Sequence, residues 1–191
     1  LTQALLKKGI AYQMDRSVYF AIAKFKPYGK LSHIGKRALK AGARVDTDEY
    51  TKQNVKDFVL WKGKKAGEPS WPAPFGEGRP GWHIECSAMS MKSLGETFDI
   101  HTGGIDLLFP HHENEIAQSE GATGKKFARF FIEGEHLLVN GEKMSKSLGN
   151  VFSLRDIESR GFSSLALRYL ALTAYYRSKL NFTWESLSGA Q

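Results

Sequence analysis

The order of apolar segments between residues 82 and 132 most constrains the fold. Residues 82–94 carry apolar side chains at helical spacing and end at a glycine, which commonly stops a helix. Residues 98–101 have the composition of a strand, a second helical segment opened by proline covers about residues 110–120, and residues 127–132 again resemble a strand. Strands that are joined by a helix normally pair in parallel. The sequence therefore predicts an α/β fold with a parallel sheet.

The N-terminal part shows a weaker pattern. Residues 1–8 predict a short helix, and residues 10–14 and 18–22 predict two strands. Residues 24–70 are polar, rich in lysine and interrupted by proline and glycine, so we expect an insertion with little core of its own. Residues 71–81 are rich in proline and glycine and predict a rigid connector back into the main fold.

Three segments follow the α/β region. Residues 135–139 are strand-like and lead into Asn140-Gly141, the preferred pair of a two-residue hairpin turn. Residues 163–177 form the longest apolar helical pattern, and residues 182–187 begin one further element.

Charge and composition favour a globular protein with an anionic partner. The chain has 191 residues, 41% of them apolar, and a net charge of +7, which suits nucleic acid or nucleotide, although a solvated basic surface has the same composition. No apolar run reaches the roughly 18 residues of a membrane span, and the first residues do not resemble a signal peptide. We therefore expect a cytoplasmic protein with no membrane partner. The single cysteine, Cys86, excludes an intrachain disulfide.

One candidate site is a loop of lysine and serine. Residues 143–147 read Lys-Met-Ser-Lys-Ser and follow the expected hairpin turn directly. Two ammonium groups and two hydroxyls among small residues suit a mobile clamp on a polyphosphate. A basic, solvated loop is the alternative. The chain contains no Walker A string, so phosphate would have to be held by side chains such as these.

The second candidate site is a set of metal ligands. Residues 110–115 read Pro-His-His-Glu-Asn-Glu. Helical residues four apart share a face, so His111 and Glu115 can hold one ion, and His112 with Glu115, three apart, is the competing register. The thiolate of Cys86 would make a third ligand and leave one position open for a substrate or a fourth ligand, as in functional zinc sites. A polar helix face beside a buried cysteine is the alternative.

These strings resemble the middle of the cysteinyl-tRNA synthetases, a family of class I enzymes, over nearly all 191 residues. The shared strings occur in the family's order and cover residues 28–32, 41–45, 67–71, 81–89, 101–107, 109–118, 143–150 and 176–178. The resemblance implies the second half of a class I Rossmann-like nucleotide-binding fold. It assigns residues 1–78 to a connective insertion within the catalytic domain, residues 79–150 to that second half with the lysine loop, and residues 151–191 to the start of a helical stem-contact region.

The resemblance also implies a zinc site for the amino acid. Zinc would be held by Cys86, His111 and Glu115, which selects the first helix register, and the fourth ligand would be a cysteine before Leu1. The ion would bind the thiol of substrate cysteine, a soft ligand that serine cannot imitate. Trp82 resembles a residue that surrounds the amino acid, with a tryptophan of the core as the alternative.

For ATP, which would bind with Mg²⁺, the resemblance implies two further groups. Gly103, Gly104 and Asp106 resemble the turn that holds the ribose and adenine, and a simple glycine turn is the alternative. Lys146 resembles the lysine that contacts the ATP phosphates, and Lys143 would assist it.

Two matches to nucleotide-binding patterns are better explained otherwise. Residues 76–81 fit Gly-x-Gly-x-x-Gly but follow a proline-rich connector instead of a strand, so we interpret them as a linker. Residues 32–36, Ser-His-Ile-Gly-Lys, are similar to the histidine signature of class I synthetases, yet they lie within the polar insertion with no strand before them. We interpret this similarity as coincidence.

The expected function is that of a cysteine-tRNA ligase, which activates cysteine with ATP to cysteinyl-AMP and transfers it to tRNA(Cys) as a monomer. The 191-residue chain alone is expected to be inactive, because the histidine signature would precede Leu1 and most of the tRNA-reading domain would follow Gln191. The chain departs from the family at Phe131, where tryptophan is expected, and at Glu133, where histidine is expected.

Two alternative functions remain. A ligase that joins cysteine to an amino sugar shares the fold and the lysine loop, but Glu115 is not expected in it. A zinc or RNA-binding remnant of a synthetase without catalytic activity is less consistent with the complete lysine loop.

Overall fold

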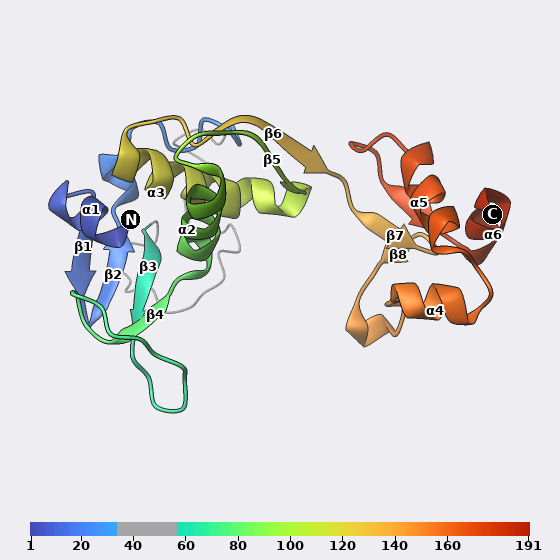
Figure 1. Ribbon diagram of the computed structural model, residues 1–191, viewed down its shortest axis with the longest axis horizontal. Coiled ribbons are helices and arrows are strands. Elements are labelled where there is room, and N and C mark those ends of the chain that lie inside the picture. Colours follow the sequence, from blue (N-terminus) through green and yellow to red (C-terminus); the bar gives the residue numbers. More distant parts are fainter. Residues whose placement is uncertain (34–56) are drawn as a thin grey trace. The chain divides into compact units, whose positions relative to one another are not determined.

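The computed structural model describes residues 1–33 and 57–191, which form two units (Figure 1). Unit 1 comprises Leu1–His101 and Asp106–Phe131, and unit 2 comprises Thr102–Ile105 and Ile132–Gln191. Three features of the sequence analysis lie outside the described residues: the family-like sequence at residues 41–45, most of the Ser-His-Ile-Gly-Lys sequence at residues 32–36, and the middle of the expected insertion. No helix among the described residues is long and apolar enough to cross a membrane.

Unit 1 begins with helix α1 (Thr2–Lys7) and a four-stranded sheet. Strands β1 (Ala11–Met14), β2 (Ser17–Phe20), β3 (Phe58–Gly63) and β4 (Gly78–Pro80) follow one another in that order, and every neighbouring pair is antiparallel. The expected helix and the first two strands are confirmed. The core of this region consists of buried apolar side chains from the sheet and the helices around it: Leu5, Val18, Phe20, Phe58, Leu60, Ile84 and Ala117.

Strand β3 corrects the expectation that residues 24–70 have little core of their own. It lies between β2 and β4, and Phe58 and Leu60 alternate into the core with almost no exposed surface. Four consecutive apolar residues at 58–61 were the sequence evidence for this strand. The strand was not predicted, because a single short apolar run within a lysine-rich segment shows no hydrophobic periodicity.

Residues 76–81 are part of the same sheet rather than only a linker. A Cβ atom on Gly78 would lie 2.1 Å from the carbonyl oxygen of Lys62, so only glycine lets β4 approach β3. The glycine pattern therefore has a packing explanation and does not form a nucleotide loop.

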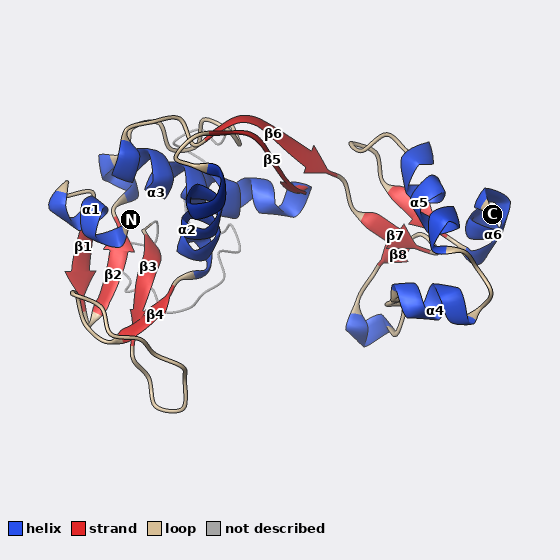
Figure 2. Ribbon diagram, viewed as in Figure 1, coloured by secondary structure: helices blue, strands red, loops and turns tan. Residues whose placement is uncertain are grey.

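Two helices complete unit 1. Helix α2 (Trp82–Leu94) has the predicted bounds and ends at Gly95. Helix α3 (Glu113–Thr123) follows a π-helical turn (Leu108–His112) that is kinked at Phe109, whose backbone is extended, so the expected helix at 110–120 begins after this kink. Strands β5 (Phe98–Gly104) and β6 (Ala128–Gly134), which flank α3 in sequence, pair with each other and run in the same direction (Figure 2). This pair is the parallel pairing that the β-α-β order predicts.

Unit 2 contains a three-stranded sheet of order β8-β7-β9. Strands β7 (Leu137–Val139) and β8 (Glu142–Lys143) form the predicted hairpin, in which Asn140 and Gly141 both have positive φ, as a two-residue turn of the preferred type requires. Strand β9 (Leu180–Phe182) pairs with β7 in parallel after helices α4 (Leu154–Ser159) and α5 (Ser164–Thr173). Helix α6 (Trp184–Ala190) ends the chain.

Helix α5 is shorter than the predicted helix at 163–177. Ala174 adopts an extended conformation, and the carbonyl oxygen of Tyr176 accepts a hydrogen bond from the backbone N–H of Glu135. This bond joins residues far apart in the sequence, so the local helical pattern could not predict it.

Candidate functional site

Helices α2 and α3 pack side by side in unit 1 and are held together by buried polar contacts. The Nε2 atom of Gln118 donates to the carbonyl oxygen of His83 at 2.5 Å and to Oγ of Ser87 at 2.6 Å, and the hydroxyl of Ser119 also donates to Ser87. Ser87, Gln118 and Ser119 are completely buried. These hydrogen bonds fix how the two helices face each other, and therefore where the candidate ligands meet.

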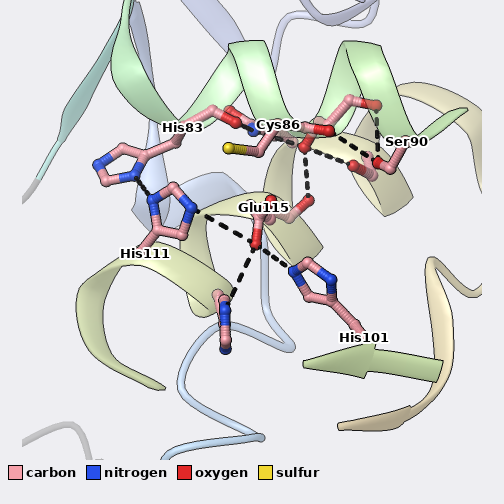
Figure 3. Close-up of polar contacts among 10 residues, drawn as sticks. His83, Cys86, Ser90, His101, His111 and Glu115 are labelled. Atoms are coloured by element: carbon pink, nitrogen blue, oxygen red, sulfur yellow. Dashed lines mark hydrogen bonds and ion pairs between the residues drawn. The ribbon is translucent and has the colours of Figure 1, made fainter. Parts of the chain in front are cut away.

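The three predicted metal ligands converge between these helices (Figure 3). Cys86 comes from α2, His111 from the π-helical turn and Glu115 from the first turn of α3. Their sulfur, nitrogen and oxygen atoms all lie within 4.8 Å of one another. His111 and Glu115 are buried, and Cys86 is half-buried. The structure thus brings Cys86 to two residues that lie 25 and 29 positions after it in the sequence.

The donor set has the chemistry of a zinc site. Burial, followed by the negative charges of Glu115 and Glu85, raises the pKa of the Cys86 thiol. Burial lowers the pKa of His111, against the opposing effect of Glu115. Atom Oε1 of Glu115 is buried and has no hydrogen-bond partner in the described part of the chain. One sulfur, one imidazole nitrogen and one carboxylate oxygen fit Zn²⁺, and a cation would satisfy the unpaired oxygen.

Two neighbours fix the ring of His111. Atoms Nδ1 of His83 and His111 lie 2.8 Å apart, so one of the rings donates a hydrogen bond to the other. Burial, and then the proximity of His111, lowers the pKa of His83 to about 3. The ring of Trp82 lies 4.5 Å from that of His111 and stacks on His83. Atom Nε2 of His111 consequently faces Glu115, whose Oε2 lies 3.8 Å away.

Sequence reasoning missed the role of His83. His83 lies three residues before Cys86 on the same helix, so both share a face of α2. This spacing was the sequence evidence that could have placed His83 beside the candidate metal ligands. A partner of this kind orients a ligating histidine in most metal sites.

A second group of histidines meets Glu115 from the other side. Atom Nε2 of His101 lies 2.7 Å from Oε2 of Glu115, and Nε2 of His112 lies 3.9 Å from the same oxygen. The rings of His101 and His112 are 4.7 Å apart, and Phe131 packs against both. Both helix registers considered from the sequence therefore bring a histidine to Glu115. Sequence reasoning missed His101, because it lies on β5 and reaches Glu115 only through tertiary packing.

Glu113 points away from these histidines, as the helical spacing predicts. Its carboxylate accepts hydrogen bonds from the backbone N–H groups of Gly29 and Ser32, at 3.0 and 2.6 Å, and from the Ser32 hydroxyl at 2.9 Å. The hydroxyl of Tyr28 also donates to Asn114. These contacts anchor residues 28–32 to the start of α3.

The lysine loop lies in unit 2 and is shaped by its own polar contacts. Oδ1 of Asn150 accepts from the backbone N–H of Ser145 at 2.8 Å, and its Nδ2 donates to the carbonyl oxygen of Lys143 at 3.1 Å. The hydroxyl of Ser145 caps a 3-10 turn (Lys146–Leu148) by accepting from the N–H of Leu148. Gly149 then takes a left-handed conformation. Within the described part of the chain neither Lys143 nor Lys146 forms an ion pair, and both side chains are exposed.

The remaining candidates follow β5. Gly103 and Gly104 are the last residues of this strand and belong to unit 2. Asp106 is exposed in a short 3-10 helix (Ile105–Leu107) and belongs to unit 1. Glu133, at which the chain departs from the resembled family, is half-buried in β6.

Comparison with known proteins finds one matching family and several similar proteins that all carry the same description. Residues 1–191 match the family described as the class I (C) tRNA synthetase catalytic domain. A cysteine-tRNA ligase from Chlamydia muridarum is 55% identical over 193 residues, 99% of this chain and 41% of that protein. Others are 58% identical over 180 residues in Solibacter usitatus (94% of this chain, 39% of that protein) and 57% identical over 191 residues in Caldicellulosiruptor saccharolyticus (100% and 41%). The chain thus spans about two fifths of the length of these relatives.

A solved structure from Campylobacter jejuni, described as an arginyl-tRNA synthetase, resembles the chain with a TM-score of 0.50. The match covers 94% of this chain and 31% of the other, at 16% sequence identity. At this identity the likeness shows the fold alone, which agrees with the predicted class I α/β architecture.

Proposed function

The chain belongs to the family of class I (C) tRNA synthetase catalytic domains, and we propose that the protein containing it is a cysteine-tRNA ligase. The ligase activates cysteine with ATP to cysteinyl-AMP and transfers the cysteine to tRNA(Cys). The observation that carries this proposal is the approach of Cys86, His111 and Glu115 to within 4.8 Å of one another. A sulfur, nitrogen and oxygen donor set of this kind suits a substrate that itself carries a thiol.

In this proposal Cys86, His111 and Glu115 hold zinc, and Trp82 bounds the space for the amino acid. Zinc, when bound, supplies a soft Lewis acid for a thiol, which a hydroxyl matches poorly. His83 keeps Nδ1 of His111 occupied, which leaves Nε2 as the ligating atom. The half-exposed ring of Trp82 covers His111 and excludes water from one side of the cluster.

The lysine loop acts on ATP, which binds with Mg²⁺. The carboxylate oxygen of cysteine attacks the α-phosphorus, the bond from that phosphorus to the bridging oxygen breaks, and pyrophosphate leaves. The ammonium group of Lys146 stabilises the charge on the departing phosphates, assisted by Lys143. Exposure of both side chains without an ion pair among the described residues supports this role. Gly103, Gly104 and Asp106 hold the ribose and adenine.

We propose the same assignment of residue ranges to parts of the enzyme that the sequence resemblance implies. Residues 1–78 are the connective insertion, residues 79–150 the second half of the nucleotide fold and residues 151–191 the start of the stem-contact region. The net charge of +7 favours the phosphate backbone of tRNA. We propose a monomeric enzyme in the cytoplasm.

Exchange of labelled pyrophosphate into ATP by the full-length protein tests the proposal. Exchange should depend on cysteine and stay near background with serine at the same concentration, and tRNA(Cys) should accept the activated cysteine. Comparable exchange with both amino acids contradicts the assigned specificity. Transfer of cysteine to an amino sugar, with none to tRNA, would instead identify the other ligase.

A further inference from the structure

The carboxylate of Glu115 lies between two groups of donors. One group consists of Cys86 and His111, and the other consists of His101 and His112. The ligand atoms of His101, His112 and Glu115 also lie within 4.8 Å of one another. This second group contains no sulfur and is not needed for the proposed binding of cysteine.

We propose that His101, His112 and Glu115 form a second position for a divalent cation, one that does not require the thiolate of Cys86. Two imidazole nitrogens and one carboxylate oxygen are a donor set for ions of intermediate softness, such as Zn²⁺, Co²⁺ and Ni²⁺. The all-oxygen preference of Ca²⁺ and Mg²⁺ excludes these two ions from it.

The surroundings of Glu115 favour a cation over hydrogen bonds alone. The side chain is completely buried, and its ion-pair partners among the described residues are all histidines. A buried carboxylate needs a compensating positive charge or full hydrogen bonding. The contact from His101 satisfies Oε2, whereas Oε1 has no hydrogen-bond partner among the residues that the structure describes. A bound cation supplies the missing partner for Oε1.

The second position is built into the core rather than placed on a mobile surface. His112 and Glu115 have at most 1% of their surface exposed, and His101 has 19% of its side chain exposed. Phe131 packs against both imidazole rings at 5.3 and 5.7 Å, and Phe98 packs against His101. The rings are therefore held near Glu115 before any ion arrives, which lowers the cost of ordering them on binding.

The two positions compete for one ion. Both use Glu115, and two divalent charges a few ångströms apart in a buried site repel each other strongly. A single carboxylate and a single thiolate do not neutralise four positive charges. The chain should therefore bind one ion at saturation, at the position with the thiolate when Cys86 is available and at the position with two histidines when it is not.

Titration of the 191-residue chain with Co²⁺ tests this inference, because its single cysteine makes any thiolate-to-cobalt absorption band specific for Cys86. The unchanged chain should bind one equivalent and show the thiolate band. Cys86→Ala should still bind one equivalent, with visible cobalt absorption but without the thiolate band. Failure of Cys86→Ala to bind Co²⁺ would overturn the inference.

Second substitutions in the Cys86→Ala chain identify the donors. His101→Asn should weaken Co²⁺ binding by more than the roughly 10- to 100-fold that the loss of an outer-shell partner costs. The control His136→Asn, in unit 2, should change it by less than about twofold. His111→Asn should weaken it less than His101→Asn does, because it removes no donor from this position. Weakening by His111→Asn with no effect of His101→Asn would show that the ion stays at the first position.

Folding of each variant is checked by thermal unfolding in the presence of a chelator. If His101→Asn unfolds, His101→Gln keeps the size of the side chain closer to that of histidine and gives the same expectation. The NMR signals of the His101 and His112 rings in the Cys86→Ala chain provide an independent measurement. Both should broaden on addition of the paramagnetic Co²⁺ before those of His136, and equal broadening of all three would contradict binding at this position.

Discussion

Glu113 and Glu115 lie two residues apart at the start of helix α3 and are both buried, but their carboxylates meet different partners. Glu113 accepts hydrogen bonds from Gly29 and Ser32, whereas the ion-pair partners of Glu115 within residues 1–33 and 57–191 are all histidines. The helical turn between them directs one carboxylate to a structural anchor and the other to the candidate metal centre. The same turn of helix therefore joins residues 28–32 to the site.

Replacement of Glu113 should destabilise unit 1. Glu113→Gln replaces one of the two carboxylate oxygens, each of which accepts from a backbone N–H, by an NH₂ group that can only donate, so the free energy of unfolding should fall by about 3 kcal/mol. Ser32→Ala is the matched control, since it removes only the hydroxyl contact and should cost about 1 kcal/mol. Urea unfolding measures both values, and equal losses would contradict the assigned role of the backbone contacts.

Loss of the Lys146 charge should slow activation of cysteine. In the full-length protein, Lys146→Ala should lower the pyrophosphate exchange rate by about 10²- to 10³-fold while the KM for cysteine changes little, because the ammonium acts on charge that develops on the phosphates. Lys125→Ala, which removes only an exposed lysine paired with Glu96, serves as the control. An unchanged rate with weakened cysteine binding would refute the role proposed for Lys146.

Asn150 should act as a positioning residue for the lysine loop. Asn150→Ala removes the hydrogen bonds to Ser145 and Lys143 at 2.8 and 3.1 Å, so the backbone amide of Ser145 should exchange with solvent faster. The exchange rate of pyrophosphate should fall, but by less than in Lys146→Ala, because no charge is lost. Ser147→Ala, which removes a hydroxyl from the same loop, is the comparison. Unaltered protection of Ser145 would show that Asn150 does not hold the loop.

The buried His83 should make the metal-free chain sensitive to acid. The pKa of His83 is about 3 in the folded chain, well below the ordinary value of 6.5. Between these values the unfolded chain binds a proton that the folded chain does not, so the free energy of unfolding falls as pH decreases, by up to about 1.4 kcal/mol per pH unit. The loss begins below pH 6.5 and continues towards pH 3.

His83→Asn tests the origin of this acid sensitivity. The variant lacks the imidazole, so its free energy of unfolding should fall less steeply between pH 6 and about pH 4 than that of the unchanged chain. Urea unfolding with a chelator present, at several pH values, gives the two slopes. Parallel slopes would mean that His83 binds the same number of protons in the folded and unfolded chains over this range.

Local chemistry determined much of this protein from the sequence alone. The glycine after α2 and the Asn140-Gly141 pair specify backbone conformations by themselves, so the bounds of α2 and the hairpin were predictable. The spacing of His111 and Glu115 likewise fixed a shared helix face, and the strings of lysine, histidine and glutamate indicated the family.

Only the tertiary structure decided the rest. Strand β3 acquires its place from pairing with β2 and β4, and α5 ends where Tyr176 meets Glu135. His101 reaches Glu115, on helix α3, from strand β5, and no local pattern records this contact. These features depend on contacts between residues distant in sequence, and their free energy comes from burial and hydrogen bonding that exist only once the chain has folded.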